Sequence, residues 1–362
     1  MRRLFTILFL FALSTSMFAQ IAISGDARVR PRMDVIDGGD FENSKTDFYY
    51  MYWAKLNLKA TIGDGWFFNT QLGHNGYGAF GFTNGLTKNV GGSNTLANQI
   101  EGATRPSLDF LQLYLGVAKQ NWGISGGLIP LGAVANPVYD VHYYSHKMID
   151  VPFYIYNIDA AFGFKGYLKL GSGQLNVLLL ADVNEYSQED KTGKELYNEN
   201  DGNTLGLDYE VQLGEFKIQP TVLFSYGRDS IKTPMTYGLN FTAPKAGNFT
   251  FSGSAFMSNQ SNDGTTEYDA WYFRLKAVGK VGPGTAVVWY DMAKRTDKYG
   301  GVIGDIETDF SYIWAMYKIP VYSGEHGTVD IMPTIRYAME SVDNVKDYSR
   351  AKIEITTHVT FK

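Results

Sequence analysis

The chain has no cysteine, few charged residues, and no long hydrophobic run beyond its first twenty residues. Without cysteine it forms no disulfide and holds no thiolate-bound metal. A helical membrane protein needs apolar stretches of about 18 residues or more. The formal net charge of −5 does not supply the basic excess of a nucleic-acid-binding protein. Disorder is excluded as well, because 44% of the residues are hydrophobic.

Aromatic residues and glycine are what the chain has in quantity. It carries 25 Tyr, 23 Phe and 39 Gly in 362 residues. Aromatic side chains favour strands, and glycine is frequent in the turns between them. The composition therefore indicates a large β protein, which is either soluble or a membrane barrel.

The first 19 residues have the layout of a secretory signal peptide. Arg2 and Arg3 precede an apolar stretch that runs from Leu4 to Leu13, and small residues lead to an expected cleavage after Ala19. The alternative is an N-terminal membrane anchor, for which the apolar stretch is short. We expect a signal peptide at residues 1–19 and a single exported domain at residues 20–362.

After the expected signal peptide, apolar and polar residues alternate in sixteen segments. In the last segment, Ile353 and Ile355 share one face, while Lys352 and Glu354 share the other. A period of two places such sets on opposite sides of a sheet. The expected strands are 21–33, 48–62, 65–75, 107–117, 121–130, 158–170, 173–185, 203–213, 215–227, 234–244, 247–258, 268–280, 284–295, 308–319, 326–341 and 348–361.

The links between these segments are alternately short and long. Seven short links, such as Gly63-Asp64 and Gly171-Ser172, interleave with eight longer ones. This order is typical of transmembrane barrels, which have short turns at the periplasmic end and longer loops outside. The sequence therefore predicts an all-β fold, a transmembrane antiparallel up-and-down β-barrel of about 16 strands. Both ends of the barrel domain are expected at the periplasmic side.

The polar faces of the segments indicate a wet interior. Ionisable residues such as Asp208, Glu210 and Arg274 alternate with apolar ones, and a dry core does not accommodate charges at this density. Sixteen strands enclose an aqueous channel. Tryptophans near the expected strand ends predict aromatic girdles at the two membrane interfaces: Trp53, Trp66, Trp122 and Trp271.

Three stretches of the chain resemble parts of Gram-negative outer-membrane porins. The stretch GDARVRPR (Gly25 to Arg32) is similar to the first strand of alginate-export-type porins. GGLIPLG (Gly126 to Gly132) resembles an element of phosphate-selective porins, with Leu131 in place of Phe. The last strand resembles the signal read by the barrel-assembly machinery, with a late aromatic at Phe361. The resemblance implies an integral outer-membrane protein surrounded by lipid, and a homotrimer by analogy.

Basic side chains are expected to line the lumen. A row of guanidinium groups attracts anions and binds carboxylates or phosphates in bidentate fashion. The alternative is that these side chains pair with lumen acids such as Asp26, Asp208, Glu210, Asp330 and Glu354. The candidates for the pore lining or for solute binding are Arg28, Arg30, Arg32, Lys55, Lys59, Lys165, Lys169, Arg274, Lys276 and Arg336; Lys217 and Lys352 share their parity.

The link at residues 131–157 is the third long loop, the one that narrows the pore in general porins. We expect the same here, with constriction residues Tyr139, Asp140, His142, Tyr143, Tyr144 and His146. The two histidines are four residues apart, but the spacing fixes no third ligand, so no metal is predicted. Acidic residues in the links at 37–47 and 297–309 do not match a calcium loop.

No enzymatic motif or cofactor-binding pattern is present in the sequence. The sequence therefore predicts a porin that lets small hydrophilic solutes or ions diffuse through an aqueous pore, with no enzymatic activity, cofactor or nucleic-acid partner. Three alternatives stay open: a substrate-specific channel for anions or oligosaccharides, a structural or interaction barrel plugged by its loops, and a soluble secreted β protein.

Overall fold

The computed structural model describes residues 20–38, 44–74, 81–83, 108–130, 160–183, 202–227, 234–260, 267–299, 304–343, 345 and 347–362. Within these ranges no helix has the length and apolar character of a membrane span. The predicted signal peptide at residues 1–19 lies outside the described residues.

Strands make up nearly all of the described chain. They are β1 (Gln20–Gly38), β2 (Lys45–Gly63), β3 (Trp66–His74), β4 (Gly81–Thr83), β5 (Leu108–Ala118), β6 (Trp122–Pro130), β7 (Ala160–Leu170), β8 (Gly173–Val183), β9 (Gly202–Leu213), β10 (Phe216–Gly227), β11 (Met235–Thr242), β12 (Phe249–Gln260), β13 (Glu267–Val281), β14 (Gly284–Lys298), β15 (Asp305–Gly324), β16 (Gly327–Val342) and β17 (Tyr348–Phe361).

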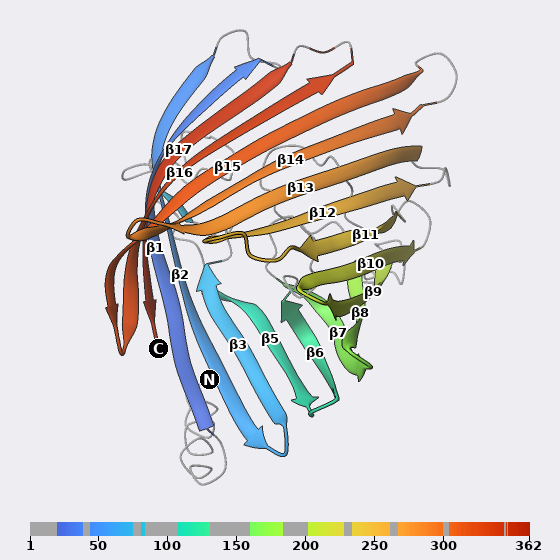
Figure 1. The fold of residues 1–362 in the computed structure, drawn as a ribbon, viewed down its shortest axis with the longest axis vertical. Helices are drawn as coiled ribbons and strands as arrows, with labels where there is room; N and C mark the ends of the chain where they lie inside the picture. Colours follow the sequence, from blue (N-terminus) through green and yellow to red (C-terminus); the bar gives the residue numbers. More distant parts are fainter. Residues whose placement is uncertain are drawn as a thin grey trace, which may run out of the picture.

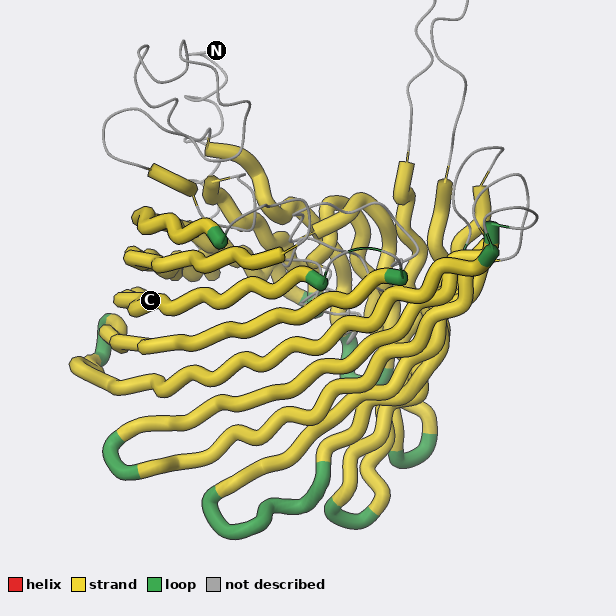
Figure 2. The backbone as a smooth tube through the Cα atoms, turned by 90° about the horizontal axis from the view of Figure 1, so that it is seen from above, coloured by secondary structure: helices red, strands yellow, loops and turns green. Residues whose placement is uncertain are grey.

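Each strand other than the short β4 pairs with antiparallel neighbours on both sides, and the ring closes where β1 meets β17. At this seam Gly25 lies opposite Phe361 and Gly38 lies opposite Tyr348. Figure 1 shows β12 to β17 as one slanting wall, with β1 continuing it beyond β17. In Figure 2 the wall curves round and tight turns join neighbouring strands. The predicted closed barrel of sixteen strands is confirmed.

The strand boundaries differ from the expectation in a few places. β1, β2 and β15 extend beyond the predicted ends, so the turn expected at 320–325 is reduced to residues 325 and 326. The link between β11 and β12 is longer than expected and spans residues 243–248. β4 was not predicted; it adds a short pairing to β2, where Thr83 lies opposite Tyr50.

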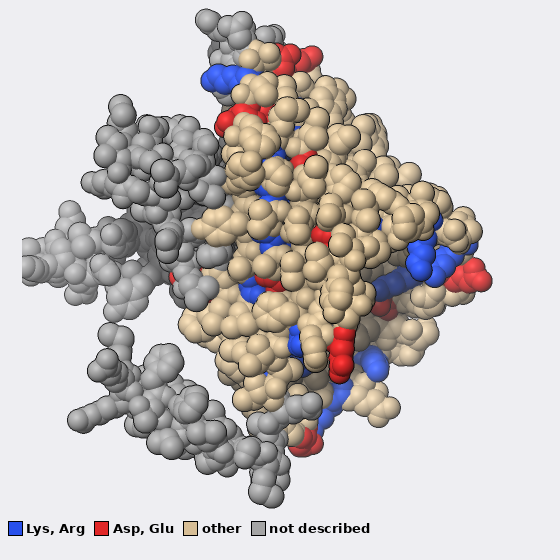
Figure 3. Space-filling model, turned by 90° about the vertical axis from the view of Figure 1, so that its left-hand side faces the viewer, with Lys and Arg blue, Asp and Glu red and all other residues tan. Residues whose placement is uncertain are grey.

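The two faces of the wall differ in chemistry as the alternation predicts. In β17 the outward Ile353 and Ile355 are about half exposed, whereas Lys352 and Glu354 are buried on the inward face. In the space-filling view most of the middle of the displayed face is uncharged, and charged groups are most prominent at its margins (Figure 3). An apolar exterior and a charged interior are the reverse of a soluble protein and fit a barrel surrounded by lipid.

Glycine in the GGLIPLG stretch has a structural cause. Gly127 has a φ of 123°, which disfavours any other residue, and a Cβ there would lie 2.4 Å from the carbonyl oxygen of Leu113. The strand β6 therefore approaches β5 closely at this point, independently of any solute.

Candidate functional site

The basic candidates on the strands lie at inward positions, in three groups around the lumen. Arg30, Arg32, Lys55, Arg274 and Arg336 are buried. The half-buried members are Arg28, Lys165 and Lys276, whereas Lys59 and Lys169 are exposed near the short-turn ends of β2 and β7. One group gathers around Glu354, and a second lies on tryptophan rings; Arg336 belongs to both. The third group, Lys165 and Lys169, lies on β7.

Glu354 is the centre of the first group. Its side chain has no exposed area and accepts a hydrogen bond from Arg32, with 2.7 Å between Arg32 Nε and Glu354 Oε2. Arg30 Nη1 lies 3.5 Å from Oε1, and Arg336 Nη2 donates to the same oxygen. Lys352 lies opposite Arg336 in the register and is buried as well. One carboxylate thus holds three guanidinium groups together.

A second pair extends this cluster along β1 and β17. Arg350 donates to both oxygens of Asp34, with 2.8 Å between Arg350 Nε and Asp34 Oδ1. The hydroxyl of Tyr49 donates to Asp34 Oδ2 over 3.0 Å, and it lies 3.4 Å from Arg32 Nη1. The side chains of β1, β2 and β17 are therefore joined into one polar network across the seam.

Trp53 lies in the lumen, so its predicted place in an aromatic girdle is wrong. The guanidinium carbon of Arg28 and the ammonium of Lys55 each lie 4.1 Å from the centroid of a Trp53 ring, an arrangement that stabilises cations. Arg28 Nε also lies 3.4 Å from Asp26. Trp66, Trp122 and Trp271 are instead exposed on the outside, where a girdle requires them.

The second group forms around two stacked tryptophans, Trp289 and Trp314, whose ring centroids are 4.2 Å apart. The guanidinium carbon of Arg336 lies 3.6 Å from the ring centroid of Trp314, and that of Arg274 lies 5.3 Å from the ring centroid of Trp289. Asp291 accepts two hydrogen bonds from Arg274, of 2.6 and 2.8 Å. Sequence reasoning missed Asp291, although its parity with Trp289 marks it as inward.

Across the lumen from the seam, half-way around the ring, lies a pocket of about 500 Å³, lined mainly by β7 to β10 and also by residues of β3, β5 and β6. Asp208 Oδ1 accepts hydrogen bonds from Asn176 (2.6 Å) and Gln219 (2.7 Å). Lys217 pairs with Glu210 at 2.7 Å. Lys165 also lines the pocket and lies 5.2 Å from the ring centroid of Tyr114.

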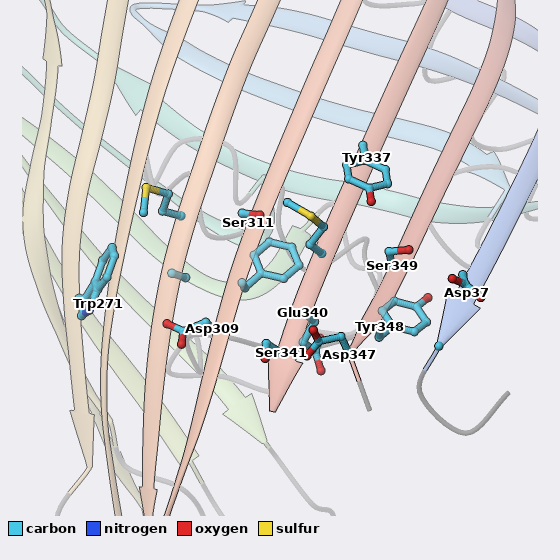
Figure 4. Close-up of a pocket in the computed structure, with 15 residues that line it drawn as sticks. Asp37, Trp271, Asp309, Ser311, Tyr337, Glu340, Ser341, Asp347, Tyr348 and Ser349 are labelled. Carbon is cyan, nitrogen blue, oxygen red and sulfur yellow. The ribbon is translucent and has the colours of Figure 1, made fainter. Parts of the chain in front are cut away.

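A further pocket, of about 660 Å³, lies near the long-loop ends of β13 to β17 and β1 (Figure 4). Its outward-facing members include Trp271, Met292, Tyr337 and Met339, all of which are exposed. Most of the lining residues have outward parity, so the pocket opens on the outer surface, with the buried Phe310 and Glu340 at its base. It therefore does not belong to a path through the barrel.

The predicted constriction residues Tyr139, Asp140, His142, Tyr143, Tyr144 and His146 lie outside the described residues. Among the residues that are described, no three His, Asp or Glu side chains come together as a metal site.

Comparison with known proteins gives a likeness of fold. No family model matches the chain, and no curated protein matches it by sequence. An anion-selective porin from Comamonas acidovorans is 10% identical, with a TM-score of 0.55 over 94% of this chain and 99% of the porin. A loop-deleted OmpT, an outer membrane protein of Vibrio cholerae, is also 10% identical, with a TM-score of 0.54 over 94% of this chain and 99% of OmpT. OmpF of Salmonella typhi, solved with daunomycin, is 12% identical, with a TM-score of 0.53 over 93% of this chain and 97% of OmpF. The chain therefore has the barrel fold of these outer-membrane proteins, porins among them.

Proposed function

We propose that this chain is an outer-membrane porin, through which small hydrophilic solutes and ions diffuse passively. The observation that carries the proposal is a closed ring of strands with apolar side chains outside and charged side chains inside. Every backbone group of such a ring is paired within the protein, as hydrocarbon requires. The likeness in fold to porins supports the same function. The proposal includes export through the predicted signal peptide, and it includes no catalysis.

We further propose that the pore prefers anions. Around Glu354, three arginines share a single carboxylate, and Lys352 lies on the same inward face opposite Arg336. Arg28 and Lys55 lie on Trp53, beside Asp26. Fixed cations in a narrow aqueous passage raise the local concentration of anions. The resemblance of two short stretches to alginate-export-type and phosphate-selective porins stays a prediction, and it assigns no solute to this pore.

The test is reconstitution of the purified protein into a planar lipid bilayer. We expect stable conductance steps and, under a salt gradient, a reversal potential that favours chloride. Arg28→Gln combined with Lys55→Gln should move the reversal potential toward the cation side. Lys245→Gln, in an exposed turn, is the matched control and should leave it unchanged. Absence of conductance would indicate a plugged barrel, and cation preference would overturn the selectivity.

Assembly is the remaining part of the proposal. Recognition of β17 by the barrel-assembly machinery through Phe361 and formation of a homotrimer follow from the resemblance to porins. One structural neighbour is described as the trimer form of OmpT of Vibrio cholerae. Mass measurement of the protein extracted in mild detergent tests the trimer, and a monomer would overturn it.

A further inference from the structure

The pocket on β7 to β10 differs in chemistry from the wall at the seam. Around Glu354 three arginines share one carboxylate, whereas the pocket has two lysines and two acids above an apolar floor. Lys217 pairs with Glu210 there, and Lys165 and the amide-bound Asp208 are the other two charged groups. Its volume of about 500 Å³ lies within the range of small-molecule sites. Together these features are complementary to a small molecule that carries a positive and a negative charge and has an apolar part.

Lys165 supplies the positive end of the pocket. It lies at an inward position of β7, half-buried, with its ammonium 5.2 Å from the ring centroid of Tyr114. The structure shows no salt bridge from Lys165 to another of the described residues, whereas Lys217 in the same pocket pairs with Glu210. A carboxylate that enters the pocket therefore finds Lys165 available without having to displace an acid of the described wall.

Asp208 supplies the negative end. The amide groups of Asn176 and Gln219 both donate to Oδ1, and Gln174 in turn donates to Asn176 over 2.7 Å. This network fixes the orientation of the carboxylate. Among the described residues, no hydrogen bond is directed at Oδ2. A ligand ammonium group is a strong donor for such an oxygen.

The two ends are separated by a distance that suits a small solute. Lys165 pairs with Leu178 on β8, Leu178 pairs with Gly206 on β9, and Asp208 follows two residues later. Two strand spacings and two residues along the strand place the two Cα atoms roughly 12 Å apart. A lysine side chain is long enough to cover much of this separation. In the structure the ammonium of Lys165 lies near Tyr114 on β5, so the side chain turns toward β9 when it binds a solute held at Asp208.

The floor between the charges is apolar. Leu178 and Leu223 line the pocket, and they belong to a buried cluster with Ile129, Ala161 and Leu180, against which Tyr114 packs. Apolar side chains at this point of a wet lumen favour a solute with an apolar part of its own.

We propose that this pocket is a binding subsite for zwitterionic amino acids with an apolar side chain. The carboxylate of the solute binds Lys165, its ammonium group binds Asp208, and its side chain lies on Leu178 and Leu223. The inference rests on the proposed function, since the pocket faces the lumen of the proposed pore, and it adds a substrate class to it.

Calorimetric titration of the full-length protein in detergent tests the subsite, with L-leucine as the probe. N-acetyl-L-leucine lacks the ammonium group, and L-leucinamide lacks the carboxylate. We expect leucine to bind about tenfold more tightly than either analogue, because each loses one charged hydrogen bond. Lys165→Gln should remove the preference over leucinamide, and Asp208→Asn should remove the preference over N-acetyl-leucine.

Matched controls separate the subsite from general effects of charge. Lys245→Gln and Asp305→Asn change exposed residues outside the pocket and should bind leucine like the unaltered protein. Heat-modifiable migration in gels verifies that each variant forms a barrel. Equal binding of the three compounds, absence of binding, or binding of glucose in place of leucine would overturn the proposal.

The outcome is distinguishable from a failure of the porin function. Leucine binding without conductance would leave the subsite standing and overturn the pore. Conductance without leucine binding would overturn the subsite alone. When both are present, leucine should reduce the ionic current in the unaltered protein and not in Lys165→Gln.

Discussion

Replacement of Glu354 by glutamine tests whether the cluster at the seam stabilises the barrel. The substitution removes the single carboxylate that Arg30, Arg32 and Arg336 share, while it keeps the size of the side chain. The glutamine retains one acceptor oxygen and turns an amide group toward a guanidinium, which leaves buried positive charges close to one another.

The magnitude follows from the burial of the group. The Glu354 side chain has no exposed area, and those of the three arginines are only 6–7% exposed. Removing one partner from a buried ion pair costs about 3–5 kcal/mol. We therefore expect the free energy of unfolding to fall by about 3–5 kcal/mol in Glu354→Gln.

Glu307→Gln is the matched control, because Glu307 pairs with Lys294 at a similar distance of 2.7 Å but is 46% exposed. Exposed pairs contribute about 0–1 kcal/mol, so this variant should be almost as stable as the original. Urea titration of the barrel folded in lipid vesicles, followed by tryptophan fluorescence, measures both. Equal stability of the two variants would refute the reasoning, and Glu354 would then be hydrated rather than buried among its arginines.

Three other predictions follow from the wall. Leu207→Arg, at an outward position in the middle of β9, should cost about 2–4 kcal/mol of unfolding free energy, whereas Leu213→Arg beside the turn should cost about 0–1; similar costs in urea titration would contradict a lipid-facing surface. Asp291→Asn should destabilise by about 3 kcal/mol, because the buried Arg274 loses a bidentate partner; an unchanged urea midpoint would contradict this. Deletion of about residues 136–150 should raise the single-channel conductance if the third long loop narrows the pore, as the sequence predicts; unchanged conductance would place that loop outside the pore.

The strand order was predictable because a membrane barrel repeats one rule along the whole chain. Apolar and polar side chains alternate with a period of two, and each turn reverses the chain. The rule fails at the ends of the longest strands. At Lys45 to Asp47 the outward position is held by the polar Thr46, yet the ladder continues opposite Asp34 to Ile36. Hydrogen bonding alone extends the strand there, and it leaves no hydrophobic pattern in the sequence.

The basic rows of the candidate site were predictable, but their partners were not. Parity places Arg30 and Arg32 on one face of β1, but their pairing with Glu354 depends on the register in which β17 meets β1. A slip of one residue reverses every side chain, and the sequence of one strand does not set the register of the other. The error at Trp53 was avoidable, because it shares its parity with Lys55.

The seam between β1 and β17 has a consequence for biogenesis. Arg32 and Glu354 are 322 residues apart in the chain, yet they form one of the most buried contacts of the barrel. The contact forms only after all the strands have paired and the first and last strands have closed the barrel. An assembly intermediate that stalls as an open sheet therefore keeps Glu354 accessible to water, so a chemical label for carboxyl groups would report, at a single residue, the moment at which insertion is complete.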